Sequence, residues 1–240
     1  MKLFHVTITG ADDSVAPEQL LDLSREYPFV EWGILFKDGR AGTPRYPTQK
    51  WIDELIAVQD STLDMNLSAH LCGQFAADLL NKQSLTISPL FKRVQINCFA
   101  EDFHNADLDK LVALRFLFGN KAEFIFQYRH TEEDKLRATD LHQYNPVGGA
   151  PNAGSFALLY DVSGGKGVLP NLWPDPPYGM RFGYAGGLNP DNLHDKLNEI
   201  ANAAGDQTVW VDMETGVRGS NDEFDLVKVR QCLELAWHYT

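Results

Sequence analysis

Hydrophobic and polar positions along this chain alternate between a pattern typical of strands and a pattern typical of helices. Short apolar runs of strand length recur eight times, and segments with apolar residues three or four positions apart lie between most of them. The predicted strands cover residues 3–9, 29–36, 67–71, 93–99, 123–128 and 156–160, with a seventh from 181 and an eighth from 208. The predicted helices cover residues 17–27, 51–58, 74–81 and 108–118, one starting at 131–134, and two with apolar faces over 193–204 and 226–237.

Eight strands that alternate with helices predict a parallel sheet, and closure into a barrel is the natural arrangement for eight. We therefore expect one α/β domain over residues 1–240, a single (β/α)₈ TIM barrel, and its length of 240 residues suits that fold. Two stretches do not fit the pattern. Residues 145–155 predict an irregular connection, and residues 168–178 contain too many prolines for a regular helix after the sixth strand.

The last two strands each end in a glycine-bearing turn that opens a helix. The first turn carries Gly186 and Gly187, followed by Asn189 as the expected N-cap and Pro190 in the first helical turn. The second carries Thr215 and Gly216. Because loops after strands 7 and 8 of such barrels commonly bind phosphate through backbone N–H groups, these residues predict a phosphate site.

Composition and charge limit the kinds of molecule and the compartment expected for this protein. A net charge of −12 without a basic stripe argues against nucleic-acid binding, and no apolar run of 18 residues indicates a membrane span. Three cysteines without metal-ligand spacing indicate reduced thiols, so we expect a cytoplasmic protein. The seven histidines show no metal-binding spacing, and there is no dinucleotide or P-loop motif, so no metal and no cofactor is expected. His5 and His70 are interpreted as barrel-lining or packed side chains.

Four motifs, in the order in which they occur, resemble those of phosphoribosylanthranilate isomerase and together cover nearly the whole chain. They are Gly33-Ile34-Leu35-Phe36 with Gly42-Thr43-Pro44-Arg45-Tyr46, Leu158-Leu159-Tyr160-Asp161 with Gly164-Gly165-Lys166-Gly167, Ala185-Gly186-Gly187-Leu188-Asn189-Pro190, and Asp212-Met213-Glu214-Thr215-Gly216-Val217. That family has a (β/α)₈ barrel and carries out an Amadori rearrangement, which needs a general acid, a general base, a phosphate anchor and a site for the anthranilate carboxylate.

The resemblance implies a role for several residues. Asp161 matches the general acid, and Arg45 matches the residue that binds the anthranilate carboxylate. Thr9 stands where the family has its basic cysteine, and a threonine hydroxyl is too weak a base to replace a thiolate unless another base activates it. Cys72 ends the third strand and is a less favoured candidate for a displaced base. The neighbouring residues Ile8 and Gly10 cannot activate Thr9, and His5 lies too deep.

The phosphate end also departs from the family. Glu214 replaces a small hydroxyl residue, and a carboxylate that faced a phosphate would repel it. Lys166 lies with Gly164 and Gly165 in the motif after the predicted strand 156–160, replaces a threonine, and is a candidate to offset that charge and bind substrate. The strand pattern leaves the direction of Glu214 open.

Each of these residues also has a structural interpretation: turn glycines, a loop cap for Asp161, and surface positions for Arg45 and Lys166.

Two functions therefore stay open. The first is an isomerase or related proton-transfer enzyme acting on a small phosphorylated, sugar-derived compound through Asp161 and Thr9. The second is a non-catalytic barrel that retains an anion pocket for binding or regulation. An aldolase-like enzyme is a distant third, since no strand carries an evident Schiff-base lysine. We expect a small phosphorylated molecule as the partner, with neither nucleic acid nor membrane, and a monomer or homodimer.

Overall fold

Eight parallel strands close into a barrel in the computed structural model, which describes residues 1–82, 87–97, 104, 107–117, 121–145, 155–164 and 166–240. The strands are paired in chain order, and β8 closes the barrel against β1. Their bounds are β1 Lys2–Thr9, β2 Val30–Lys37, β3 Asn66–Cys72, β4 Arg93–Asn97, β5 Glu123–Tyr128, β6 Phe156–Tyr160, β7 Arg181–Ala185 and β8 Thr208–Met213. The predicted fold class of one α/β barrel with eight parallel strands is confirmed. The predicted end of the fourth strand, at residues 98–99, lies outside the described residues.

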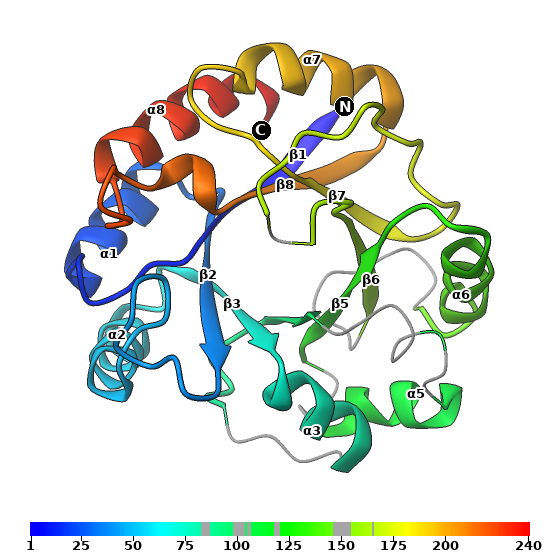
Figure 1. Cartoon of the computed structure of the whole chain (residues 1–240), viewed down its shortest axis with the longest axis horizontal. Helices are drawn as coiled ribbons and strands as arrows, with labels where there is room; N and C mark the ends of the chain where they lie inside the picture. Colours follow the sequence, from blue (N-terminus) through cyan, green and yellow to red (C-terminus); the bar gives the residue numbers. More distant parts are fainter. Residues whose placement is uncertain (83–86, 98–103, 105–106, 118–120, 146–154, 165) are drawn as a thin grey trace.

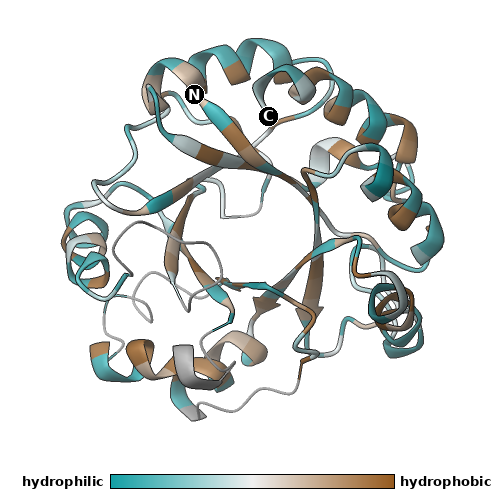
Figure 2. Ribbon diagram, turned by 180° about the vertical axis from the view of Figure 1, so that it is seen from behind, coloured by the Kyte–Doolittle hydropathy of each residue, from teal (hydrophilic) through white to brown (hydrophobic). Residues whose placement is uncertain are grey.

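Seven α-helices in the described ranges form a ring outside the barrel (Figure 1). They are α1 Pro17–Glu26, α2 Gln49–Thr62, α3 Gln74–Lys82, α5 Leu108–Leu117, α6 Glu132–His142, α7 Leu193–Ala204 and α8 Leu226–Ala236, with short 3₁₀ helices η1 Thr215–Val217 and η2 Trp237–Tyr239. Figure 2 shows hydrophobic positions on the strands and on the helices, interrupted by hydrophilic positions on the outer helix surfaces. No helix in this described part has the length and hydropathy needed to cross a bilayer.

Local chemistry fixes the helix starts. The Thr48 hydroxyl caps α2 by accepting from the Trp51 N–H at 3.2 Å. Thr131 and Asp134 cap each other's backbone at the start of α6, as the acidic run of the sequence indicates. The Asp225 carboxylate accepts from two N–H groups of the first turn of α8. These caps hold the connections at the C-terminal ends of the strands, where the site lies.

Two helix predictions need correction. Helix α7 begins at Leu193 and its N-cap is Asn192, not Asn189. The Asn189 side chain instead accepts from the Asp191 N–H at 2.9 Å, so the local hydrogen bond forms a turn before the helix. Trp237 does not extend the buried face of α8 but lies in η2, 49% exposed and edge-on to Tyr27.

The barrel interior is charged at its base. Arg93 donates to Glu31 and to Glu123, each at 2.7 Å, and all three side chains are buried. Trp210 packs against this group, with the Arg93 guanidinium carbon 4.2 Å from its ring centroid, and lies beside Gly183, where any side chain would overlap the indole ring. Each of the three buried charges therefore has a partner of opposite charge, which offsets the cost of burying it.

The connection between β6 and β7 runs over the barrel mouth without a helix, as the prolines predict (Figure 1). Three side-chain hydrogen bonds hold it. Tyr160 donates to the Leu172 carbonyl at 3.1 Å, Tyr184 donates to the Pro174 carbonyl at 2.8 Å, and the Trp173 indole donates to Glu199. This connection is therefore fixed to the barrel, and it forms one wall of the site.

Candidate functional site

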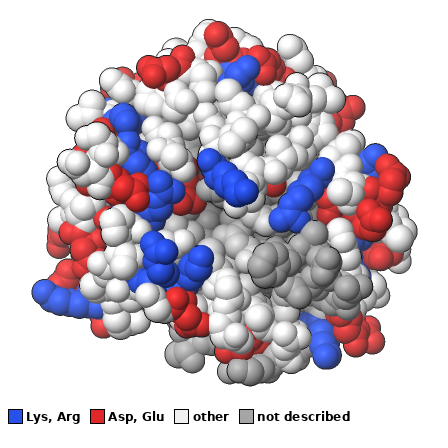
Figure 3. All heavy atoms as spheres, in the orientation of Figure 1, with Lys and Arg blue, Asp and Glu red and all other residues white. Residues whose placement is uncertain are grey.

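A cavity opens at the C-terminal ends of the strands and contains about 540 Å³ of empty space, part of it open to solvent. Side chains and turns from strands β1 and β3 to β8 line it. Four residues that the sequence predicts for the site meet here although they lie far apart in the chain: Thr9, Asp161, Gly187 and Gly216. Gly186 and Thr215 also line it. Lys and Arg side chains surround the hollow at the centre of this face (Figure 3).

Thr9 has a partner that the sequence analysis missed. Its hydroxyl donates to Asp212 Oδ1 at 2.7 Å, and both side chains are buried. Burial raises the pKa of Asp212 to about 8, the Glu214 and Asp161 carboxylates add to that shift, and the Thr9 hydroxyl opposes it. Closure of β8 onto β1 brings the two residues together, so the barrel prediction itself contained the signal.

Asp161 follows β6 and is only 6% exposed. The Ser163 N–H and hydroxyl donate to its Oδ1 at 2.9 and 2.7 Å. These bonds fix the carboxyl group at the cavity wall, close enough to Asp212 for its charge to act on the pKa of that residue. The mouth thus holds two buried carboxyl groups with different surroundings, the arrangement that lets one serve as acid and the other as base.

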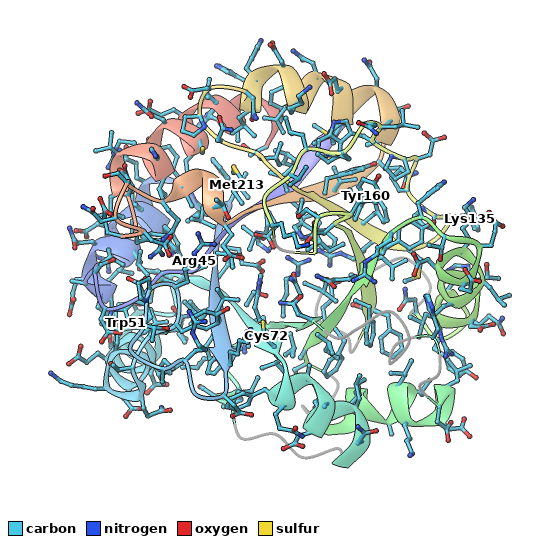
Figure 4. All side chains as sticks on the ribbon, viewed as in Figure 1. Arg45, Trp51, Cys72, Lys135, Tyr160 and Met213 are labelled. Carbon is cyan, nitrogen blue, oxygen red and sulfur yellow. The ribbon has the colours of Figure 1, made fainter. Side chains whose placement is uncertain are left out.

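Arg45 lies at the barrel mouth (Figure 4), but carboxylates of the chain itself occupy its guanidinium group. Nη1 donates to Glu214 Oε1 at 2.7 Å, while Nε and Nη2 bind Asp222 at 3.1 and 2.9 Å. A further bond goes to the Thr215 hydroxyl at 3.1 Å. The hydrogen bonds that Arg45 donates to the Asp222 and Glu214 carboxylates raise its pKa. Glu214 therefore points to Arg45, and this arginine, not Lys166, neutralises it.

Arg45 also has an unusual backbone, with φ of 76°. Its N–H donates to Asp12 Oδ2 at 2.6 Å, and the same Asp12 oxygen accepts from Arg218 at 2.7 Å. A non-glycine residue in this region of φ is strained and needs surrounding contacts to hold it. Arg45 thus connects the loop after β2 to the residues that follow β8, through its backbone N–H and its guanidinium group.

Two glycines of the predicted phosphate loops, Gly187 and Gly216, pack tightly against neighbouring backbone. Gly187 has φ of 66°, and a Cβ there would lie 2.7 Å from the Leu169 nitrogen. Gly216 opens η1 so close to the Leu188 carbonyl that a side chain would overlap it. Gly164 has φ of 59°, has open space where a side chain would lie, and does not line the cavity, and Gly165 lies outside the described residues. Lys166 is exposed, and no ion pair joins it to another described residue.

Carboxamide side chains line the other wall. Gln95 and Asn97 come from β4, and Gln127 comes from β5. The Gln95 amide donates to Asn97 Oδ1 at 2.9 Å, and the Asn97 amide donates to Cys72 Sγ at 3.3 Å. These three residues could not be recognised from the sequence, because single amides at strand ends carry no distinctive pattern.

His70 and Cys72, on β3, differ in their capacity to accept a hydrogen bond or a proton. Burial lowers the pKa of His70 to about 4, so its imidazole is neutral, and its Nε2 has no hydrogen-bond partner among the described residues. Burial raises the pKa of the Cys72 thiol, so it stays protonated near neutral pH and is a poor base. The interpretation of His70 as a barrel-lining residue is confirmed.

Arg129, directly after β5, is a further cation that the sequence analysis missed. It is half-buried, and its guanidinium donates to Gln127 Oε1 at 3.2 Å. None of the ion pairs in the described part of the chain involves it, in contrast to Arg45. In this same part, no three His, Cys, Asp or Glu residues are grouped as metal ligands.

Comparison with known proteins agrees with the geometry at the level of the fold. No family model matches the chain, and a search of curated proteins finds no match. Several solved structures match over 98% of this chain. TrpF from Jonesia denitrificans has 18% sequence identity and a TM-score of 0.59, with 98% of its own chain covered. Phosphoribosyl anthranilate isomerase from Thermus thermophilus has 14% identity and a TM-score of 0.60, with 100% covered.

A third match is phosphoribosyl anthranilate isomerase in complex with reduced 1-(o-carboxyphenylamino)-1-deoxyribulose 5-phosphate, at 14% identity and a TM-score of 0.59, covering 98% of this chain and 100% of that one. The motif resemblance is thus matched by structural similarity over the full length. Identities of this size establish the shared fold and leave the activity to be argued from the site.

Proposed function

We propose that this protein is a proton-transfer enzyme, of the isomerase type, that acts on a small phosphorylated, sugar-derived compound. The observation that carries the proposal is the pair of carboxyl groups at one barrel mouth, Asp161 and Asp212, of which Asp212 has a pKa raised to about 8 by burial. Strongly perturbed carboxyl groups in a cleft are typical of acid–base sites.

The phosphate would bind where β6, β7 and β8 end. The turn at Gly186 and Gly187 and the backbone of Thr215 and Gly216 line the same cavity, and N–H groups in such turns suit an anion. Lys166 does not line the cavity, but it directly precedes Gly167, which does, and its exposed side chain would supply a positive charge at the rim. Glu214 does not oppose this site strongly, because Arg45 neutralises it at 2.7 Å.

In the reaction, Asp212, which burial keeps protonated near neutral pH, would donate its proton to the sugar ring oxygen as the bond from that oxygen to C1 breaks. The Thr9 hydroxyl would orient Asp212 from 2.7 Å. The Asp161 carboxylate, whose charge acts on Asp212, would accept the carbon-bound proton from C2. This assignment makes Thr9 a positioning residue, and it departs from the resemblance, which implies that Asp161 is the acid.

The geometry argues against phosphoribosylanthranilate as a good substrate. The guanidinium of Arg45, which would bind the anthranilate carboxylate, already binds Glu214 and Asp222. The same occupied arginine, with threonine in the cysteine position, is the observation that favours the second candidate, a non-catalytic barrel with an anion pocket.

Solvent-deuterium incorporation separates the two candidates. A panel of pentose and hexose phosphates and their 1-amino derivatives is incubated with the protein in D₂O, and a mass increase at a carbon-bound position is measured. We expect exchange with the natural protein and a loss of about 10²–10⁴-fold with Asp161→Asn or Asp212→Asn. Asp206→Asn, at an exposed position at the other end of β8, is the matched control. Binding without exchange across the panel would support the non-catalytic barrel and contradict the proposed enzyme.

A further inference from the structure

We infer that the end of the ligand away from the phosphate is uncharged and rich in hydroxyl groups, and that the carboxamides of Gln95, Asn97 and Gln127 bind it. This inference rests on the proposed phosphate site at β6–β8 and names the class of compound that this site takes. It concerns the opposite wall of the cavity, formed by β4 and β5, which lies across the barrel from β8 and β1 (Figure 1).

The three carboxamides form a continuous polar wall. In the register of the sheet, Gln95 pairs with His70 and Asn97 with Cys72, so both belong to the row of side chains at the end of their strands. Gln95 donates one N–H to Asn97 at 2.9 Å, and Gln127 accepts from Arg129 at 3.2 Å. Among the described residues nothing donates to Gln95 Oε1, and nothing accepts from the Gln127 amide. An acceptor and a donor are thus left facing the cavity.

A row of neutral donors and acceptors is complementary to hydroxyl groups, because each hydroxyl both donates and accepts a hydrogen bond. A ligand hydroxyl that gives a partner to a polar group of this wall gains affinity, most of all at a group that is buried and unpartnered. His70 adds to this wall a neutral imidazole whose Nε2 is buried and without a partner among the described residues.

The same cavity offers no free guanidinium from Arg45 to a carboxylate and no ring to an aromatic group. The guanidinium that would bind a carboxylate uses its N–H groups on Glu214, Asp222 and Thr215. No Phe, Tyr or Trp lines the described cavity, so an aryl group would find no ring to stack against. The site therefore selects a polyol-like phosphate over an N-aryl one.

The test uses isothermal titration of the full chain with four probes: inorganic phosphate, ribitol 5-phosphate, ribitol 1,5-bisphosphate and the reduced carboxyphenylamino-deoxyribulose 5-phosphate. We expect ribitol 5-phosphate to bind at least tenfold more tightly than inorganic phosphate, and the aryl compound to bind no more tightly than ribitol 5-phosphate. Gln95→Leu and Gln127→Leu should each remove most of that tenfold gain and leave the affinity for inorganic phosphate unchanged. Gln207→Leu, exposed at the far end of the barrel, is the matched control.

The outcomes separate the two proposals. Equal affinity for inorganic phosphate and ribitol 5-phosphate would overturn the inference and leave the phosphate site intact. Tighter binding of the aryl compound would also overturn it. A bisphosphate that binds more than tenfold better than the monophosphate would assign Arg129 to a second anion and contradict an uncharged end. Failure of all four probes to bind would overturn the phosphate site and the inference together. Gln127→Ala, at a half-buried position, replaces the leucine variant if that one does not fold.

Discussion

Replacing Asp212 with asparagine should make the folded protein more stable at pH 7.5 and leave its stability at pH 4.5 nearly unchanged. Asp212 is 7% exposed, and burial raises its pKa to about 8. Asparagine keeps the shape of the protonated carboxyl group, and its oxygen can accept the Thr9 hydroxyl as Asp212 does at 2.7 Å. The substitution therefore removes the titration without removing the hydrogen bond.

The sign of the effect follows from proton binding. In the unfolded chain an aspartate ionises near pH 4, whereas folded Asp212 keeps its proton up to about pH 8. Between these values the folded state binds more protons, so the natural protein loses stability as pH rises. At about 1.4 kcal/mol per pH unit, the three units from pH 4.5 to 7.5 amount to about 4 kcal/mol.

Urea unfolding at both pH values measures this difference, with Asp206→Asn as the control for a carboxylate removed from the surface. The asparagine variant should gain up to about 4 kcal/mol over the natural protein between pH 4.5 and pH 7.5, while losing catalysis. Equal pH dependence in the two proteins would show that Asp212 ionises like an ordinary aspartate, and the assignment of Asp212 as the acid would be refuted.

Three further substitutions test other parts of the account. Arg93→Met should lower the free energy of unfolding by about 3–5 kcal/mol, because it leaves Glu31 and Glu123 buried without their partner. A loss below about 1 kcal/mol in urea unfolding would contradict the role of Arg93 in neutralising these two buried carboxylates. Between pH 6.5 and 4.5 the His70 imidazole takes up a proton in the unfolded chain but not in the folded protein, so the natural protein loses about 2–3 kcal/mol of stability. His70→Gln should therefore flatten the pH dependence of stability in this range. An unchanged slope in the variant would contradict a pKa near 4 for folded His70. In an isomerase assay backed by complementation of a tryptophan auxotroph, the natural protein should be poor or inactive, and Thr9→Cys should gain at most weak activity; robust turnover by the natural protein would mean that another residue replaces the cysteine.

The fold could be predicted from the sequence because each strand and helix carries its own periodic signal. Strands 5 and 6 begin and end where the apolar runs predict, and the absence of a helix after β6 follows from proline chemistry. The start of α7 was wrong because Asn189 can cap either a helix or a turn, and only the backbone around it decides between them.

The site was less accessible to sequence reasoning, because its decisive contacts join distant loops. Thr9 and Asp212 are 203 residues apart, and Arg45 and Glu214 are 169 residues apart. Periodicity places each residue at a strand end but leaves open the direction of a side chain in the turn that follows. The motif that contains Asp212 was recognised, yet the role of this residue depends on its burial beside β1, which appears only when the barrel is closed.

The central claim is that Asp212, held by Thr9, transfers the proton in this barrel, and the pH dependence of deuterium incorporation tests it most directly. For a panel phosphate that exchanges, the rate should fall as pH rises past a pKa of about 8, since the protonated carboxyl group is the active form. Asp212→Asn should remove this fall and reduce the rate by about 10²–10⁴-fold. The same fall with pH in the asparagine variant, at a similar rate, would contradict the claim.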